Sequence, residues 1–140
     1  MTGWTLVRAS AGPTCGESTW CSLSWTEGAN LQGAQLQGAV LQGADLSDAD
    51  LTAAELDEAG LLDADLNRAT LRKAELTAAD LRGATLEGAD LREAILEDAL
   101  IDPAQLRQVA SLAGATLPDG TKLSQGGWEA EFDAWCRQQT

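Results

Sequence analysis

Apolar residues recur at every fifth position along most of this chain. Ala stands at every fifth position from 29 to 104, and Leu at every fifth position from 31 to 106, with Ile101 as the single exception. Polar residues fill most of the three positions in between. This beat of five is the strongest regularity in the sequence, and we place its end at residue 103.

A period of five fits neither a helix nor a flat strand. At about 100° per residue, successive leucines would rotate by about 140° around a helix and form no stripe. In a flat strand they would alternate between the two faces, because five is odd. Every Leu can point inward if the chain bends once per repeat. Ala and Leu then share one face, the residue between them points out, and the last two residues form a corner.

The corner positions carry their own signal. The second corner residue is Gly at several repeats, and a turn that needs a positive φ favours glycine there. These glycines are Gly33, Gly38, Gly43, Gly83 and Gly88.

The repeating units, such as Ala-Asn-Leu-Gln-Gly from Ala29 and Ala-Asp-Leu-Ser-Asp from Ala44, resemble the pentapeptide-repeat family. Its motif is Ala-(Asp/Asn)-Leu-X-X, and fifteen consecutive units from 29 to 103 carry Ala in the first place. The resemblance implies an all-β solenoid, a right-handed quadrilateral β-helix with about four regular coils. The units depart from the motif in the second place at Val40, Gly60, Ile95 and Leu100.

The segment after the repeats predicts a helix and then a return to the coil. Asp102-Pro103 is a helix start, with an N-cap Asp and Pro in the first position. Leu106, Val109, Ala110 and Ala113 follow at helical spacing. The stretch 102–121, which contains Leu-Pro-Asp-Gly-Thr, resembles the closing segment of cyanobacterial pentapeptide-repeat proteins, in which a helix bulges from the last coil and a strand at Thr116 completes it.

The two ends of the chain lie outside the beat and hold all five Trp. Large aromatics suit the covering of an open solenoid end, so we interpret Trp4, Trp20 and Trp25 as part of an N-terminal cap; an aromatic docking surface is the alternative. Trp128, Phe132 and Trp135 form one stripe of a short C-terminal amphipathic helix. That helix is predicted to cap the rod; dimerisation or binding of a foreign partner are the alternatives.

The chain is therefore divided into four segments of one structural domain. They are an N-terminal cap or degenerate first coil at 1–28, the repeat β-helix at 29–103, a helix and closing strand at 104–121, and the C-terminal amphipathic helix at 122–140.

Composition narrows the function. The 140 residues carry a net charge of −13, which should repel nucleic acid and anionic membranes, so a charged partner should be a basic protein. His and Tyr are absent, and Cys15, Cys21 and Cys136 match no zinc motif. We therefore expect no enzyme activity, no metal and no cofactor. The sequence has no apolar run long enough for a membrane span and no export signal, so a cytoplasmic location is expected.

The resemblance implies four units to a coil, so units twenty residues apart should stack and sort the outward residues into four faces. One face gathers six carboxylates and no basic residue, and it predicts either a docking surface for a basic partner or a solvated surface that aids solubility. We call it the acidic face: Glu55, Asp57, Glu58, Glu75, Glu97 and Asp98. The next face carries three aliphatics, Val40, Leu62 and Leu100, for which the C-terminal helix is a candidate cover.

These features favour a non-enzymatic binding or scaffold protein. The alternative is a nucleic-acid mimic, because some members of the family that the chain resembles inhibit DNA gyrase. Residues 29–108 hold 16 acidic and 6 basic residues, a net charge of −10. Duplex DNA carries about 11 charges over a rod of about 19 Å, so the totals are comparable.

Overall fold

The computed structural model describes residues 30–139 and shows one repeating local structure through residue 100. Each five-residue unit has a bridge residue, a buried Leu, a two-residue turn and a buried Ala. A hydrogen bond closes each turn; in the first, the Ala34 amide donates to the Leu31 carbonyl oxygen at 3.0 Å. The chain therefore changes direction once every five residues, as the period predicts.

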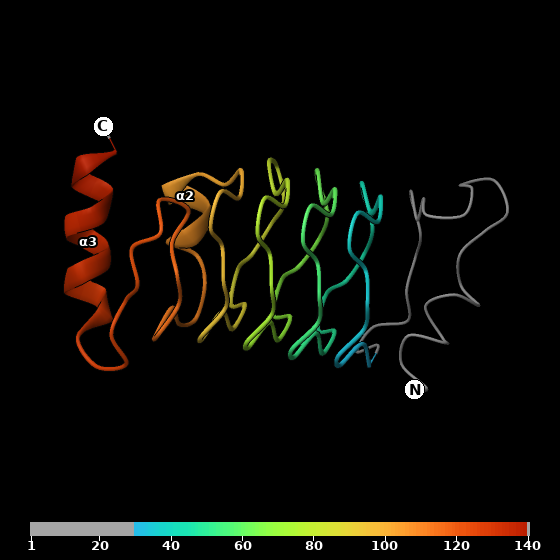
Figure 1. Cartoon of the computed structure of the whole chain (residues 1–140), viewed down its shortest axis with the longest axis horizontal. Helices are drawn as coiled ribbons and strands as arrows, with labels where there is room; N and C mark the ends of the chain where they lie inside the picture. Colours follow the sequence, from blue (N-terminus) through green and yellow to red (C-terminus); the bar gives the residue numbers. More distant parts are fainter. Residues whose placement is uncertain (1–29, 140) are drawn as a thin grey trace, which may run out of the picture.

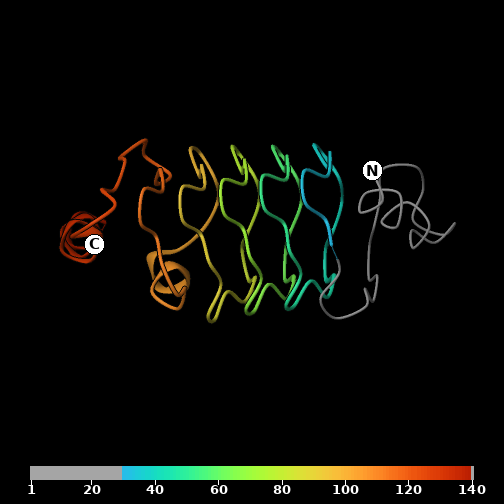
Figure 2. The same cartoon turned by 90° about the horizontal axis from the view of Figure 1, so that it is seen from below.

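Successive coils stack through parallel β-bridges between residues twenty apart. The bridges are isolated single pairs, such as Asn30 with Asp50 and Glu55 with Glu75. Backbone hydrogen bonds on either side of each bridge join residues 19 or 21 apart: the Leu51 amide donates to the Thr70 carbonyl oxygen at 2.7 Å, and the Glu55 amide donates to the Ala34 carbonyl oxygen at 2.9 Å. Twenty residues per coil and one corner every five residues give four sides. The coils lie one after another along a single axis (Figures 1 and 2).

The interior consists of the Leu and Ala of the beat. Every such Leu from Leu31 to Leu96 is at most 5% exposed, and Leu51, Leu56, Leu61 and Leu66 lie in the middle of this column. Among the described residues no polar or charged residue is buried. The core is thus dry and filled, because leucine side chains from stacked coils occupy the space inside the four walls.

The second corner residue adopts a positive φ along the rod. The five glycines predicted for this conformation have φ between 64° and 75°, which confirms the prediction. Nine residues other than glycine adopt the same conformation, among them Ala53, Glu58 and Lys73 with φ of 60° or 61°. A turn with positive φ only at its third residue is a type II turn. The turn geometry is therefore imposed by stacking, even where a side chain makes it costly.

The short helix α2, Pro103–Leu106, bulges from the last coil. The prediction that the helix continues through Ala113 is wrong. After α2 the chain returns to the coil, and Ser111 bridges to Asp90. The reason is backbone hydrogen bonding: the Ala110 amide donates to the Ala89 carbonyl oxygen at 2.7 Å, which a continued helix would prevent. The expected return strand at Thr116 bridges to Ile95. Both bridges span 21 residues because α2 adds one.

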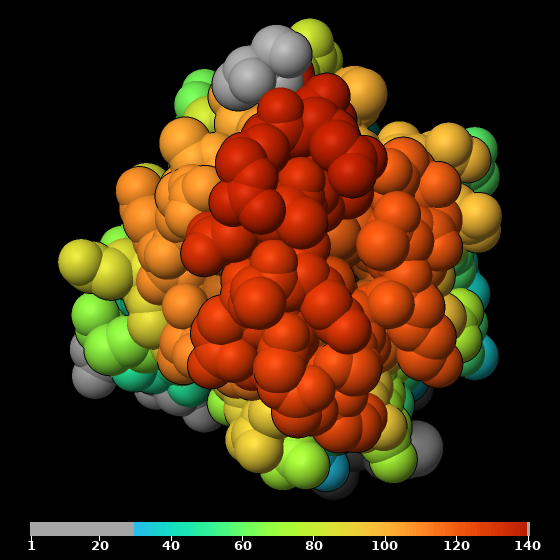
Figure 3. All heavy atoms as spheres, turned by 90° about the vertical axis from the view of Figure 1, so that its left-hand side faces the viewer, coloured from blue at the N-terminus to red at the C-terminus, as the bar shows by residue number. Residues whose placement is uncertain are grey.

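Helix α3, Trp128–Gln138, lies across the C-terminal end of the rod (Figures 1 and 3). Before it, Lys122 pairs antiparallel with Thr116. The sequence made helix α3 a candidate cover for the aliphatic face, but α3 does not cover it. Val40 and Leu100 on that face are 38% and 49% exposed. An amphipathic helix gains more by covering the open apolar end than by covering scattered aliphatics. The N-terminal segment 1–28, with its three Trp and two Cys, lies outside the described residues.

Candidate functional site

The acidic face contains carboxylates that have almost no partners among the residues that the structure describes. Glu55 and Glu75 are bridge partners, so two carboxylate side chains leave adjacent coils side by side. Within residues 30–139 none of the six acidic residues forms an ion pair. Glu55 alone accepts a side-chain hydrogen bond, from the Gln37 amide. Glu58, Glu75, Glu97 and Asp98 are exposed and Glu55 and Asp57 are half-buried, and no ion pair within the described residues compensates their charge.

On a third group of stacked units, which carries Asp50 and Asp90 and which we call the first face, carboxylates stabilise the turns. Asp50 accepts hydrogen bonds from the Thr52 amide and hydroxyl at 3.1 and 2.6 Å. Burial alone would raise the pKa of Asp50, but hydrogen bonds from Thr52 and Gln32 outweigh it and lower this pKa. Asp90 pairs with Arg92 at 2.6 Å, and this hydrogen-bonded guanidinium lowers the pKa of Asp90. The carboxylates of Asp50 and Asp90 therefore both form contacts within the protein.

The face that carries Val40, Leu62 and Leu100, which we call the third face, uses its carboxylate Asp80 in the same way. Asp80 accepts from the Arg82 amide at 3.2 Å and pairs with the Arg82 guanidinium at 2.7 Å. The pKa of Asp80 is lowered, first by that side-chain hydrogen bond. The predicted aliphatics lie on the same face, where Val40 and Leu100 are exposed and Leu62 is half-buried. A fourth aliphatic, Ile95, is 37% exposed on the acidic face.

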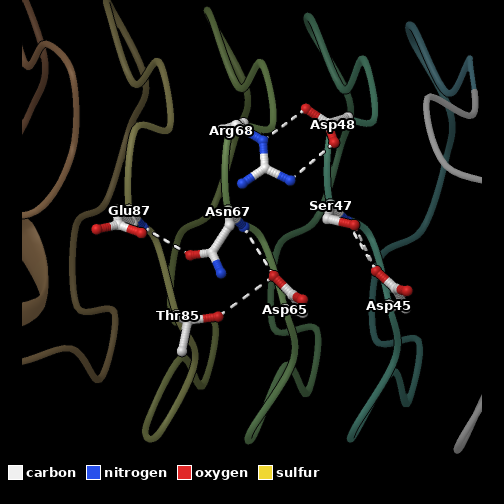
Figure 4. A network of polar contacts seen from close by, with 8 residues as sticks. All are labelled: Asp45, Ser47, Asp48, Asp65, Asn67, Arg68, Thr85 and Glu87. Atoms are coloured by element: carbon white, nitrogen blue, oxygen red, sulfur yellow. Dashed lines mark hydrogen bonds and ion pairs between the residues drawn. The ribbon is translucent and has the colours of Figure 1, made fainter.

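The fourth face, which carries the residues from Asp45 to Asp48, from Asp65 to Arg68 and from Thr85 to Glu87, holds a network of polar contacts that crosses the coils (Figure 4). The Arg68 guanidinium pairs with Asp48 one coil away at 2.9 Å, and this hydrogen bond lowers the pKa of Asp48. The Asn67 side-chain oxygen accepts from the Glu87 amide on the next coil at 2.8 Å. Asp65 in turn accepts from the Asn67 amide at 3.0 Å. On this face, polar side chains therefore form ion pairs and hydrogen bonds between neighbouring coils.

The second position of each unit explains the difference between the faces. Asp, with one methylene, reaches the backbone amide two residues later and forms an Asx turn. Glu is longer, and neither Glu55 nor Glu75 makes that bond in the described structure. The signal was present in the sequence as Glu in place of Asp at this position. It separates the Asp residues that form turn contacts from Glu55 and Glu75, which form none.

The residues named as cap or dimer contacts lie in two environments. Phe132 and Trp135 are buried at 4% and 5% exposure and stack with ring centroids 5.8 Å apart. Trp128 is half-buried at the start of α3. The aromatic stripe thus packs inward against the rod end.

A pocket of about 250 Å³ lies between α2 and α3, and the sequence analysis missed it. Arg107 stands at its edge, 3.0 Å from Asp133 and 5.6 Å from the centre of the Phe132 ring. This hollow forms only because α3 packs near α2. The sequence predicted α3 from its helical spacing, but no pattern in it predicted a pocket. The lining residues are Leu106, Arg107, Val109, Trp128, Glu129, Phe132 and Asp133.

Reactive and metal-binding groups are sparse in the part of the chain that the structure describes. Cys136 is a free, buried thiol, and burial raises its pKa, which disfavours the reactive thiolate. Residues 30–139 contain no cluster of three or more metal-ligating side chains. Over the same residues, neither helix is long and apolar enough to cross a membrane.

Comparison with known proteins reveals relatives of the same repeat type. The chain is similar to Rfr23 from the cyanobacterium Cyanothece 51142, with 34% identity over 54% of each chain and a TM-score of 0.38. It is also similar to HetL of Nostoc sp. strain PCC 7120, a protein involved in heterocyst differentiation regulation, with 34% identity, 74% of this chain and 55% of HetL covered, and a TM-score of 0.33.

A third similar structure is a pentapeptide repeat protein of the Arabidopsis thaliana thylakoid lumen, with 27% identity, a TM-score of 0.35, and 66% of this chain and 67% of that protein covered. The matches thus span about half the length of the first two relatives. No protein of curated function matches the chain.

The family model for pentapeptide repeats matches residues 29–61 and 61–98 in eight copies, which together span half of the chain. The chain therefore belongs to the pentapeptide repeat family, whose members fold as right-handed quadrilateral β-helices.

Proposed function

We propose that this protein is a non-enzymatic scaffold whose acidic face binds a basic protein partner. One observation carries the proposal. The Asp residues at the second position of the other faces are engaged in turn and ion-pair contacts, whereas the six carboxylates of the acidic face form no ion pair in the described structure. Carboxylates that form no ion pair in the described structure are available to recognise positive charge.

The dry interior supports a role on the outside of the rod. Because stacked leucines fill the core, a small molecule has no site inside the coils. The regular bridges hold the outer side chains on a rigid backbone, and Glu55 and Glu75 recur on adjacent coils. A rigid surface with a repeated charge suits an extended basic segment, since little ordering entropy is lost on binding.

Affinity capture from the native host with two matched triple variants tests the proposal. The test variant reverses charge on the acidic face with Asp57→Lys, Glu58→Lys and Glu75→Lys. The control reverses Asp63, Glu87 and Glu93 to Lys, so each variant changes the net charge from −13 to −7 by six units. We expect proteins captured by the wild type to be lost with the test variant and retained with the control. Equal capture by both variants overturns the proposal.

A DNA-mimicking gyrase inhibitor is the second candidate, and the net charge of −10 over residues 29–108 favours it. Against it, arginines interrupt the charge on three faces, where Arg68, Arg82 and Arg92 pair with carboxylates. A supercoiling assay with purified gyrase distinguishes the two. Inhibition at micromolar protein supports the mimic, and unchanged supercoiling eliminates it.

A further inference from the structure

We infer that the pocket between α2 and α3 is a second binding site, which takes a single Lys or Arg side chain from a basic protein. This pocket shares no residue with the acidic face, so the inference stands apart from the function proposed above. It has an apolar floor and a charged rim, which are the two features that a long cationic side chain requires.

The floor suits the aliphatic stem of such a side chain. Leu106 is fully buried at the end of α2, and Phe132 is 4% exposed on α3. Val109 and Trp128 are half-buried and close the sides. At about 250 Å³ the hollow has room for one side chain, and it lies below the usual range of pockets for drug-sized ligands.

The rim suits a positive head group. Glu129 and Asp133 bring two carboxylates and Arg107 one guanidinium, so the local charge is 1 − 2 = −1. Arg107 is already paired with Asp133 at 3.0 Å. Glu129 is exposed and forms no ion pair in residues 30–139, so it is the carboxylate left for an incoming cation.

The chain itself shows that this surface accepts a cation. The Arg107 guanidinium lies 5.6 Å from the Phe132 ring centre, within cation–π range, while it pairs with the Asp133 carboxylate. Trp128 and Glu129 also line the pocket and supply a second aromatic ring and a second carboxylate. A Lys or Arg from a partner would repeat the internal arrangement with these two residues, and the net charge of −13 would attract it.

Nuclear magnetic resonance titration of the full-length chain tests this inference. The reporter is the Trp128 indole N–H resonance, assigned by its loss in Trp128→Phe. The probes are N-acetyl-arginine amide, N-acetyl-lysine amide and N-acetyl-norleucine amide, which share an aliphatic stem while norleucine lacks the charge. We expect a saturable shift with arginine and lysine, and binding at least about threefold weaker with norleucine.

Two variants separate the pocket from general attraction to an acidic protein. Glu129→Gln should weaken arginine binding about threefold to fivefold, whereas Asp63→Asn, which removes the same charge outside both the pocket and the acidic face, should leave it unchanged. Dispersed amide spectra establish that each variant is folded. Equal binding of norleucine and arginine, equal effects of the two variants, or no saturable Trp128 shift at millimolar probe each overturn the inference. Because the norleucine comparison uses the unaltered protein, it holds even if a variant fails to fold.

Discussion

Gln105 donates hydrogen bonds from its side-chain amide to the carbonyl oxygen of Leu81 at 2.7 Å, one coil away, and to that of Ala84 at 2.8 Å. Its side-chain oxygen accepts from the Asp102 amide at 2.8 Å. Helix α2 replaces the wall segment that would pair with the coil below, so this amide substitutes for lost backbone bonds.

Replacement of Gln105 by Leu should therefore destabilise the protein by about 1–3 kcal/mol, because half-buried carbonyl groups lose a donor. The measurement is urea unfolding followed by circular dichroism. Gln108→Leu is the control, since the Gln108 side chain is exposed and makes no side-chain bond in the described structure. Equal destabilisation by both substitutions contradicts the proposed role of Gln105.

Two neighbouring alanines should respond in opposite directions to glycine. Ala53 is exposed at a corner with φ of 60°, a conformation that costs a residue with Cβ about 1 kcal/mol. Ala53→Gly should stabilise the protein by a few tenths to about 1 kcal/mol. Ala54 is fully buried with ordinary φ, so Ala54→Gly should destabilise it by about 1 kcal/mol or more.

The urea midpoints of these two variants against wild type check the pair. A loss of stability in both would show that the left-handed corner residues carry no strain.

Acid should weaken the rod through the paired aspartates. The pKa values of Asp80 and Asp90 are lowered in the folded state, chiefly by hydrogen bonds from Arg82 and Arg92. A lowered folded pKa contributes stability that is present above the unfolded value of about 3.9 and is lost as pH falls through the folded value. We expect the free energy of unfolding to decrease below about pH 4.

Asp90→Asn should reduce stability at pH 7 by less than about 1 kcal/mol and flatten this acid dependence. Urea unfolding at pH 7 and pH 3 measures both effects. Asp63→Asn serves as the control because Asp63 forms no ion pair in residues 30–139. An unchanged pH slope in Asp90→Asn would argue against the assignment.

The aromatic contacts of α3 should protect the C-terminal end. Trp135 is 5% exposed in the core cluster, so Trp135→Ala should cost about 3–5 kcal/mol. In a stacked array each coil supports its neighbours, so the damage should begin at the last coil. Hydrogen exchange should rise more at Leu117 and Leu123 than at Leu51.

The exposed residue Gln138 on the same helix provides the comparison. Gln138→Ala should leave both stability and exchange close to wild type. Uniform exchange changes along the whole rod in Trp135→Ala would contradict the role of α3 as an end cover.

The five-residue period predicted three features from the sequence alone: the extended segment of each unit, the turn that follows it and the buried Leu and Ala of the core. Leu can remain inside at a period of five only if the chain turns once per repeat, so Leu31 and Leu96 could be assigned to the core without coordinates. The acidic residues could also be grouped on one face once the resemblance to the pentapeptide-repeat family implied four units to a coil. These inferences succeed because each depends on local spacing that repeats.

Tertiary structure decided what the spacing leaves open. Helical spacing after Asp102 continues to Ala113, yet the helix ends at Leu106 because the backbone of Ala110 must bond to the coil below. Asp48 pairs with Arg68, one coil away, whereas Asp80 pairs with Arg82, two residues away in the sequence. No sequence pattern indicates this difference. The pocket at Trp128 exists only because α3 crosses the rod end. Sequence thus specified the periodic part, whereas contacts between non-repeating segments depend on packing geometry that becomes defined only in the folded chain.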